Sequence, residues 1–138
     1  MRIAALIVAA GRGTRATSGQ GAGGQGAGPK QYAAIGGRAV LTRAIDAFAR
    51  HPEITEIKVV IHPDDAELYG RATAGCGAGK LSAAAIGGPS RQASVLRGLE
   101  ALASEAPDVV LIHDAARPFV SSKTISNVIA ALRDRPGA

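Results

Sequence analysis

Residues 3–15 read IAALIVAAGRGTR, and this stretch decides how the chain folds. The run is apolar without alternation, which is typical of a strand buried on both faces of a parallel sheet, so we expect a strand over residues 2–9. Gly11 and Gly13 then end the strand and turn the chain sharply. Small residues at such a turn leave backbone N–H groups accessible to a polyphosphate.

The next stretch, residues 16–29, reads ATSGQGAGGQGAGP, with six glycines and no charge. This composition predicts a flexible loop. Arg15 precedes the loop and Lys30 follows it, in the sequence PKQY. Each of these side chains alone is also compatible with an ordinary solvated surface residue. As a pair around a glycine-rich loop, they favour nucleotidyl transfer, because a triphosphate needs fixed cations as well as backbone N–H groups.

Helical and strand patterns alternate along the rest of the sequence. We expect helices over residues 39–50, 62–71, 90–104 and 121–133, and strands over residues 56–61, 81–86 and 108–112. This alternation predicts one domain over residues 1–138, an α/β Rossmann-like fold with three layers, in which a mostly parallel sheet carries helices on both faces. Ligands in such folds bind at the carboxyl ends of the strands, so the loops at 10–30, 87–94 and 113–118 should meet at one edge.

The composition limits the function classes. The chain is 46% hydrophobic but only 3% aromatic, so its core must consist of Val, Ile, Leu and Ala. A net charge of +5 fits a phosphate-rich ligand or simply an Arg-rich surface, and the absence of a Lys/Arg-rich run argues against nucleic acid. A single cysteine, Cys76, indicates a reducing compartment. With no signal peptide and no apolar run of about 18 residues, we expect a cytoplasmic protein that does not enter a membrane.

The turn after the first strand also matches a different class of protein. Residues 11–16 fit G-x-G-x-x-A, the dinucleotide-binding fingerprint. That site also needs an acidic residue about 20 positions further on, whereas the first acid after the loop is Asp46. A nicotinamide- or flavin-dependent oxidoreductase is therefore a weaker alternative.

A second candidate site is His113-Asp114, directly after the last apolar strand. Mg²⁺ is commonly held by one or two carboxylates together with substrate phosphates, and Asp114 lies where such a ligand belongs. The other interpretations are that Asp114 caps the next turn and that His113 is a core histidine. Since no second acid is nearby, the sequence does not predict a two-metal site.

Four motifs together resemble a known family. VAAGRGTR, PKQY, GGPSRQASV and HDAARP, in this order, are similar to the 2-C-methyl-D-erythritol 4-phosphate cytidylyltransferases of isoprenoid precursor synthesis. The resemblance covers nearly all of this chain but only the N-terminal portion of the family. It implies a fold of the nucleotide-diphospho-sugar transferase type. It also implies attack by the methylerythritol 4-phosphate oxygen on the α-phosphorus of CTP, with release of pyrophosphate.

The resemblance implies a role for each matching residue. The nucleotide-binding residues would be Ala9, Ala10, Gly11, Gly13, Gly88 and Ser94, the last two at the cytosine. Arg15 and Lys30 would be catalytic and would stabilise charge on the α-phosphate. Asp114 would serve Mg²⁺ and the polyol phosphate, with Arg117 close to that phosphate.

Three features depart from the family pattern. The loop between Arg15 and Lys30 is longer, and Pro89 stands where many members have a backbone N–H. The C-terminal half of the family pattern is missing, including the arm that forms the homodimer and basic groups for the polyol phosphate. Alternatives therefore remain: a cytidylyltransferase for another polyol phosphate, such as ribitol 5-phosphate, or an inactive nucleotide-binding module.

Overall fold

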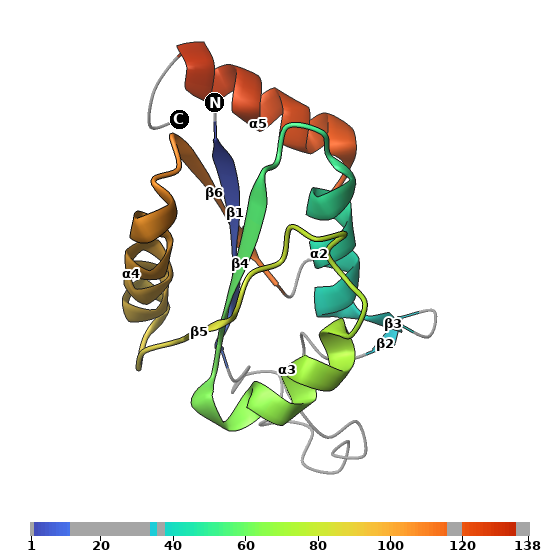
Figure 1. Ribbon diagram of the computed structural model, residues 1–138, viewed down its shortest axis with the longest axis vertical. Coiled ribbons are helices and arrows are strands. Elements are labelled where there is room, and N and C mark those ends of the chain that lie inside the picture. The colour runs from blue at the N-terminus through green and yellow to red at the C-terminus, as the bar shows by residue number, and fades with distance from the viewer. Residues whose placement is uncertain (1, 12–33, 36–37, 116–119, 135–138) are drawn as a thin grey trace, which may run out of the picture.

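The computed structural model describes residues 2–11, 34–35, 38–115 and 120–134 (Figure 1). The strands are β1 (Ile3–Ala9), β2 (Ala34–Ile35), β3 (Arg38–Ala39), β4 (Glu56–Ile61), β5 (Ala85–Ile86) and β6 (Val109–Asp114). The helices are α2 (Val40–Arg50), α3 (Ala66–Thr73), α4 (Arg91–Leu102) and α5 (Ser122–Asp134), with 3-10 turns η3 (Pro63–Asp65) and η4 (Ala103–Glu105).

The main sheet has the strand order β5-β4-β1-β6, and every neighbouring pair is parallel. β1 lies in the middle of the sheet: Val8 is in register with Val60 of β4 on one side and with Asp114 of β6 on the other. All seven residues of β1 are buried, as the continuous apolar run predicts. The sequence therefore correctly predicts a mostly parallel sheet and a first strand that is buried on both faces.

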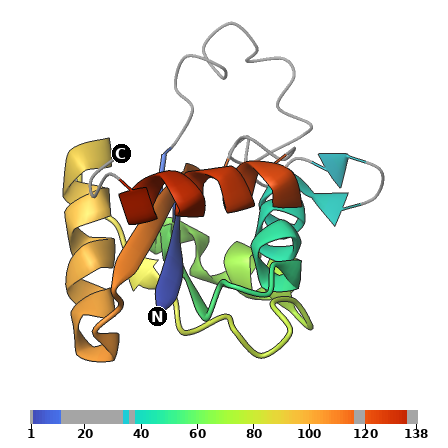
Figure 2. The same ribbon diagram turned by 90° about the horizontal axis from the view of Figure 1, so that it is seen from above.

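Helices cover both faces of this sheet, so the three-layer prediction is also correct (Figures 1 and 2). One face of β1, with Ile3, Ala5 and Ile7, belongs to a core cluster with residues of α2 and α5. The opposite face, with Ala4 and Leu6, belongs to a smaller cluster with Leu102 at the end of α4. α4 packs closely on the sheet at Gly98, where a Cβ would lie 2.5 Å from Leu6 Cδ1.

The predicted core composition is largely correct. Among the residues that the structure describes, the buried hydrophobic ones are Val, Ile, Leu and Ala together with one aromatic residue, Phe48. In α2, the four apolar positions that predict the helix (Leu41, Ala44, Ile45 and Phe48) are all buried. In α5, Ile125 and Ile129 are buried as expected, whereas Val128 is 40% exposed.

Three segments differ from the expectation. The predicted strand over residues 81–86 is reduced to β5 and an isolated bridge between Leu81 and Ile57. Its alanines provide little apolar area, and the Lys58 ammonium donates to the Ala83 carbonyl at 2.6 Å between these two pieces. The sequence interpretation also missed the antiparallel pair β2–β3. A smaller difference is that β6 continues through Asp114, two residues beyond the expected end.

The proposed flexible loop at residues 16–29 lies outside the described residues, so its flexibility stays a prediction. None of the helices among the residues that the structure describes has the length and apolar character that crossing a membrane requires.

Candidate active site

The candidate site lies at the carboxyl edge of the sheet, where the parallel strands end together (Figure 1). Ala10 follows β1, Gly87 follows β5 and Ala115 follows β6. Backbone hydrogen bonds connect two of these ends to the neighbouring strands. The Gly87 N–H donates to the Ile61 carbonyl at 2.7 Å, and the Ala115 N–H donates to the Val8 carbonyl at 3.0 Å. The described ends of the three predicted loops therefore meet at one edge.

Gly87 is the most crowded of these positions. A Cβ on Gly87 would lie 2.5 Å from Ala10 Cβ, 2.7 Å from Ser94 Oγ and 3.3 Å from Val60 Cγ1. Only glycine fits there without a shift of the surrounding chain. The sequence interpretation assigned a role to Gly88 but not to Gly87, although the Gly-Gly pair was the available signal.

Ser94 and Gly88, both predicted to contact the base, contact each other. The Ser94 Oγ accepts the Gly88 N–H at 3.1 Å and lies 3.4 Å from the Gly88 carbonyl oxygen. Ser94 is only 2% exposed. Its hydroxyl therefore faces its own main chain in this structure, and direct contact with a base stays a prediction.

Ser90 is the N-cap of α4, and its Oγ accepts the Ala93 N–H at 3.0 Å. The helix thus begins at the same edge as the loop that contains Gly87 and Gly88. A Cβ on Gly88 would lie 2.6 Å from Ala93 Cβ, so the first turn of α4 packs directly against this loop.

At the end of β1, Ala9 and Ala10 are buried and Gly11 is exposed. A Cβ on Gly11 would meet no atom within 4 Å, so packing among the described residues does not require glycine there. The close approach of a ligand to the backbone remains the predicted reason for this glycine.

Asp114 is exposed at the end of β6, and its carboxylate is a suitable hard oxygen ligand for Mg²⁺. Within the described part of the chain, no three His, Cys, Asp or Glu side chains are grouped closely enough to hold a metal ion. A single carboxylate still fits Mg²⁺ if substrate phosphates complete the coordination. Asp114 as the metal ligand therefore stays a prediction.

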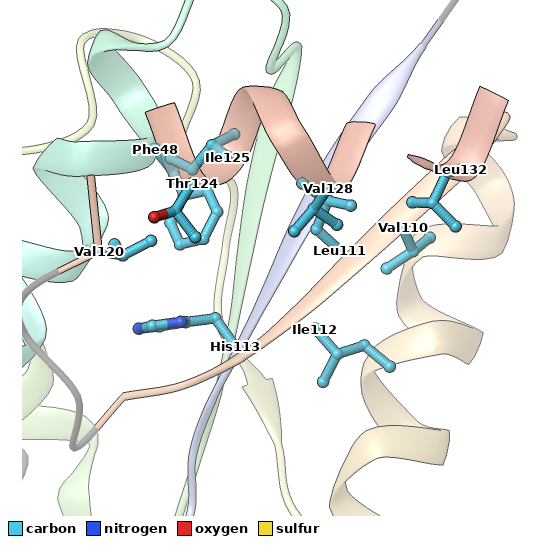
Figure 3. Close-up of a pocket in the computed structure, with 10 residues that line it drawn as sticks. All are labelled: Phe48, Val110, Leu111, Ile112, His113, Val120, Thr124, Ile125, Val128 and Leu132. Atoms are coloured by element: carbon cyan, nitrogen blue, oxygen red, sulfur yellow. The ribbon is translucent and has the colours of Figure 1, made fainter. Parts of the chain in front are cut away.

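His113 is neither a buried core residue nor a fully exposed one. Its ring packs edge-on against Phe48 with 5.3 Å between the ring centroids. It lines a mostly apolar cavity of about 440 Å³ between β6 and α5 (Figure 3). Ile112 points from the other face of β6 and is 47% exposed, so this outer strand carries apolar side chains on both faces (Figure 3).

Four of the predicted site residues, Gly13, Arg15, Lys30 and Arg117, lie outside the described residues. Their roles stay predictions. Sequence reasoning also missed Asp65, which follows β4 at the same edge and is only 4% exposed. Its position in a Pro-Asp-Asp turn gave no signal that the second aspartate is buried.

Three further titratable groups, His51, His62 and Tyr69, have structural positions. His51 is 2% exposed, and its Nε2 lies 2.8 Å from Ser126 Oγ. His62 accepts the Asp64 N–H at its Nδ1 and thereby caps η3. On α3, burial raises the pKa of Tyr69 to about 12.

Comparison with known proteins identifies relatives over nearly the whole chain. Residues 3–138 match the family model for IspD, 2-C-methyl-D-erythritol 4-phosphate cytidylyltransferase. The bifunctional enzyme IspD/IspF of Bradyrhizobium sp. (strain ORS 278) is 54% identical over 130 residues, which are 94% of this chain and 30% of that protein. The chain thus spans less than a third of that relative.

Solved structures agree with this match. The 4-diphosphocytidyl-2C-methyl-D-erythritol synthase from Anaerococcus prevotii is 34% identical, with a TM-score of 0.73 over 96% of this chain and 51% of that one. A CMP:2-keto-3-deoxy-manno-octonic acid synthetase has a TM-score of 0.71 over 99% of this chain and 49% of that one, at 14% identity. That second likeness supports the fold alone.

Proposed function

Because this chain belongs to the 2-C-methyl-D-erythritol 4-phosphate cytidylyltransferase family, we propose that it forms the nucleotide-binding part of an enzyme that joins CTP and 2-C-methyl-D-erythritol 4-phosphate. A phosphate oxygen of the polyol attacks the α-phosphorus of CTP and forms a new P–O bond. The bond from the α-phosphorus to the bridging oxygen breaks, and its electron pair leaves with pyrophosphate. The family match over residues 3–138 is the observation that carries this proposal.

The arrangement of the described edge supports the proposal. Phosphoryl-type transfer needs little covalent chemistry from the protein, so positioning and electrostatics supply most of the catalysis. Small residues at the strand ends, Ala10 and Gly11 after β1 and Gly87 and Gly88 after β5, let a nucleotide approach the main chain closely. The net charge of +5 also favours a polyanionic substrate.

Arg15 and Lys30 are the proposed catalytic cations. They would neutralise negative charge that increases at the α-phosphate as the new bond forms. On this proposal, replacing either by Ala lowers kcat by about 100-fold or more and changes CTP affinity much less. Equal losses in kcat and affinity would contradict this assignment.

Asp114 is the proposed ligand of Mg²⁺, and Arg117 is proposed to bind the polyol phosphate. When bound, Mg²⁺ supplies positive charge that offsets the triphosphate. The carboxylate of Asp114 would hold the ion at the edge of the sheet and orient the polyol beside it. Asp114→Asn should raise the Mg²⁺ concentration needed for half-maximal turnover, and an unchanged requirement would place the metal site elsewhere.

The biological setting extends the proposal. We expect the enzyme to act in the cytoplasm, because its one cysteine fits a reducing compartment. We also expect a homodimer in the longer family members, through the arm that this sequence does not include. The relatives favour methylerythritol phosphate over another polyol phosphate as the acceptor.

The test is pyrophosphate release in the presence of Mg²⁺, with each of the four NTPs and with or without 2-C-methyl-D-erythritol 4-phosphate. It should be run on this chain and on the longest protein that its source encodes. We expect release only with CTP and the polyol phosphate together, in the longer protein at least. Release with ribitol 5-phosphate instead, or no release from either protein, would contradict the proposal.

A further inference from the structure

We propose that Ser94 is a positioning residue, which fixes the Gly87–Pro89 loop through the Gly88 N–H and so prepares the base site before a nucleotide arrives. This inference rests on the proposed function for the identity of the nucleotide. On this inference, Ser94 acts on the base site through its hydrogen bond to the Gly88 main chain. It differs from the role that the resemblance implies, in which Ser94 contacts the base directly.

The first observation is the environment of the Ser94 side chain. It is buried, at 2% exposure, on the side of α4 that faces the sheet. Its Oγ accepts the Gly88 N–H at 3.1 Å and has the Gly88 carbonyl oxygen at 3.4 Å. One hydroxyl therefore faces both the donor and the acceptor of a single residue in the loop.

The second observation is that the loop is held from three directions. The Gly87 N–H donates to the Ile61 carbonyl of β4 at 2.7 Å. Ala10 at the end of β1 and Ser94 both fill the space where a Gly87 Cβ would lie. Ala93 fills the corresponding space beside Gly88. Ser94 thus completes a set of contacts that joins β1, β4 and α4 around two glycines.

The third observation concerns the hydrogen-bond donors of the loop. The N–H groups of Gly87 and Gly88 are both used within the protein, and Pro89 has no N–H. While Ser94 holds Gly88, none of these three residues has an unused backbone donor. In the trans peptide unit 87–88, the Gly87 carbonyl points away from the Gly88 N–H that Ser94 holds, so it is the acceptor that the fixed loop would offer to a base. An acceptor suits the exocyclic amino group of cytosine and disfavours the O4 carbonyl of uracil.

Without the Ser94 hydroxyl, the Gly88 N–H would lose its partner and the peptide unit at 87–88 would be free to rotate, since glycines restrict rotation least. A rotated unit would present a donor where the fixed loop presents an acceptor. Ser94 would therefore affect both the affinity for CTP and the preference for CTP over UTP.

The experiment compares Ser94→Ala with Ser90→Ala in the full chain. The two serines make a matched pair, because each Oγ accepts one backbone N–H at about the same distance and both stand at the start of α4. Only Ser94→Ala removes the bond to Gly88. The readouts are hydrogen exchange of the Gly88 amide in the nucleotide-free protein, measured by ¹⁵N NMR, and the dissociation constants of CTP and UTP.

We expect Ser94→Ala to speed Gly88 exchange about 10-fold, because a lost hydrogen bond of typical strength changes an equilibrium by about that factor. We also expect it to weaken CTP binding about 5-fold and to lower the CTP/UTP ratio. Ser94→Cys, which keeps the size but accepts hydrogen bonds weakly, should fall between Ser and Ala. Ser90→Ala should leave Gly88 exchange close to that of the unmodified protein.

Weaker CTP binding with unchanged Gly88 exchange would overturn the inference, since it would mean that Ser94 contacts the base directly. Faster exchange with unchanged nucleotide binding and preference would also overturn it. If Ser90→Ala matches Ser94→Ala in all readouts, the effect is general loosening of α4. Gly88 exchange in the free protein does not depend on catalysis, so failure of the proposed reaction is distinguishable from failure of this inference.

Discussion

The two ends of the main sheet are built from different kinds of residues. At the amino end, the residues directly before three strands, Arg2, Thr55 and Asp108, connect those strands through polar contacts. The Asp108 carboxylate accepts the Arg2 N–H at 2.7 Å, and the Thr55 Oγ1 lies 3.1 Å from the Ile3 nitrogen and 3.0 Å from its carbonyl oxygen. At the carboxyl end, β1, β5 and β6 are directly followed by the small residues Ala10, Gly87 and Ala115, whereas β4 is followed by His62.

The difference indicates that the two ends have separate tasks. Side chains at the amino end join strands that are 52 to 106 residues apart in the sequence, which fixes the order of the sheet. Small residues at the carboxyl end leave main chain within reach of a ligand. We therefore expect substitutions at the carboxyl end to affect nucleotide binding and turnover first, and substitutions at the amino end to affect stability.

The largest effect should come from Gly87→Ala. The new Cβ would collide with Ala10 Cβ and Ser94 Oγ, and both are too close to the backbone to move alone. We expect turnover to fall about 100-fold, as when a site is displaced by about 1 Å. Gly70→Ala is the control, because a Cβ at Gly70 would meet no atom within 4 Å. Steady-state kinetics would measure both, and equal activity of the two variants would break the comparison.

The next effect tests the amino end. His51 is buried after α2; its Nδ1 accepts the Glu53 N–H at 3.1 Å, so its Nε2 carries the proton and donates to Ser126 Oγ. His51→Ala removes both bonds and leaves a cavity, which should lower the free energy of unfolding by about 3 kcal/mol. Ser126→Ala should lower it by about 1 kcal/mol. Urea unfolding measures these free energies. A fall of more than about 2-fold in the CTP affinity of a folded variant would contradict the separate tasks of the two ends of the sheet.

Thr55→Val should have an intermediate effect. Valine has nearly the same shape but cannot bond to the Ile3 N–H, which is partly buried at the start of β1. We expect a loss of about 1.5 kcal/mol in the free energy of unfolding, with unchanged nucleotide affinity. Thr55→Ser retains the hydroxyl and should recover most of that loss. A Val variant as stable as the Ser variant would show that this link does not hold β1 and β4 together.

Arg133 and Glu53 make an ion pair across the surface between α5 and the segment after α2. Both side chains are substantially exposed, at 49% and 37%. Because solvent and salt screen such pairs, Arg133→Ala should lower the free energy of unfolding by about 0.5 kcal/mol or less. A loss above 1 kcal/mol in 0.15 M salt would mean that the amino end depends on surface charge as well as on its buried contacts.

The smallest effect at neutral pH concerns Tyr69 on α3, which packs against the core near the carboxyl end. Burial raises the pKa of Tyr69 from 10 to about 12. The unfolded chain therefore loses this proton first, so stability should fall as the pH rises from 10 to 12. Tyr69→Phe should be nearly neutral at pH 7 and remove this fall. Absorbance titration of the unmodified chain tests the shift; two tyrosines that both titrate near pH 10 would exclude it.

Much of the fold follows from short-range patterns in the sequence. The apolar runs of β1 and β4 predict strands, because a strand buried on both faces has apolar residues at successive positions. The spacing of apolar residues in α2 predicts a helix, because residues three and four positions apart lie on the same side of a helix. β2 and β3 are two residues each and have no such pattern. The Gly36-Gly37 dipeptide between them was a hairpin signal that the sequence interpretation did not use.

The sequence predicts the location of the candidate site better than the contacts of its side chains. Parallel strands must end at one edge, so the meeting of the loops after β1 and β5 follows from the element order. The direction of the Ser94 hydroxyl does not follow, because sequence spacing cannot tell a side chain that faces a ligand from one that bonds its own loop. The crowding at Gly87 depends on Ala10, which is 77 residues away in the sequence.

The central position of β1 has a consequence for how the protein is made. β1 leaves the ribosome before both of its partners, which are β4, beginning at residue 56, and β6, beginning at residue 109. Until most of the chain has been synthesised, seven apolar residues have an unpaired edge, and long-range parallel pairing of this kind is slow. During synthesis this apolar strand is therefore open to aggregation and to chaperones until its partners are available.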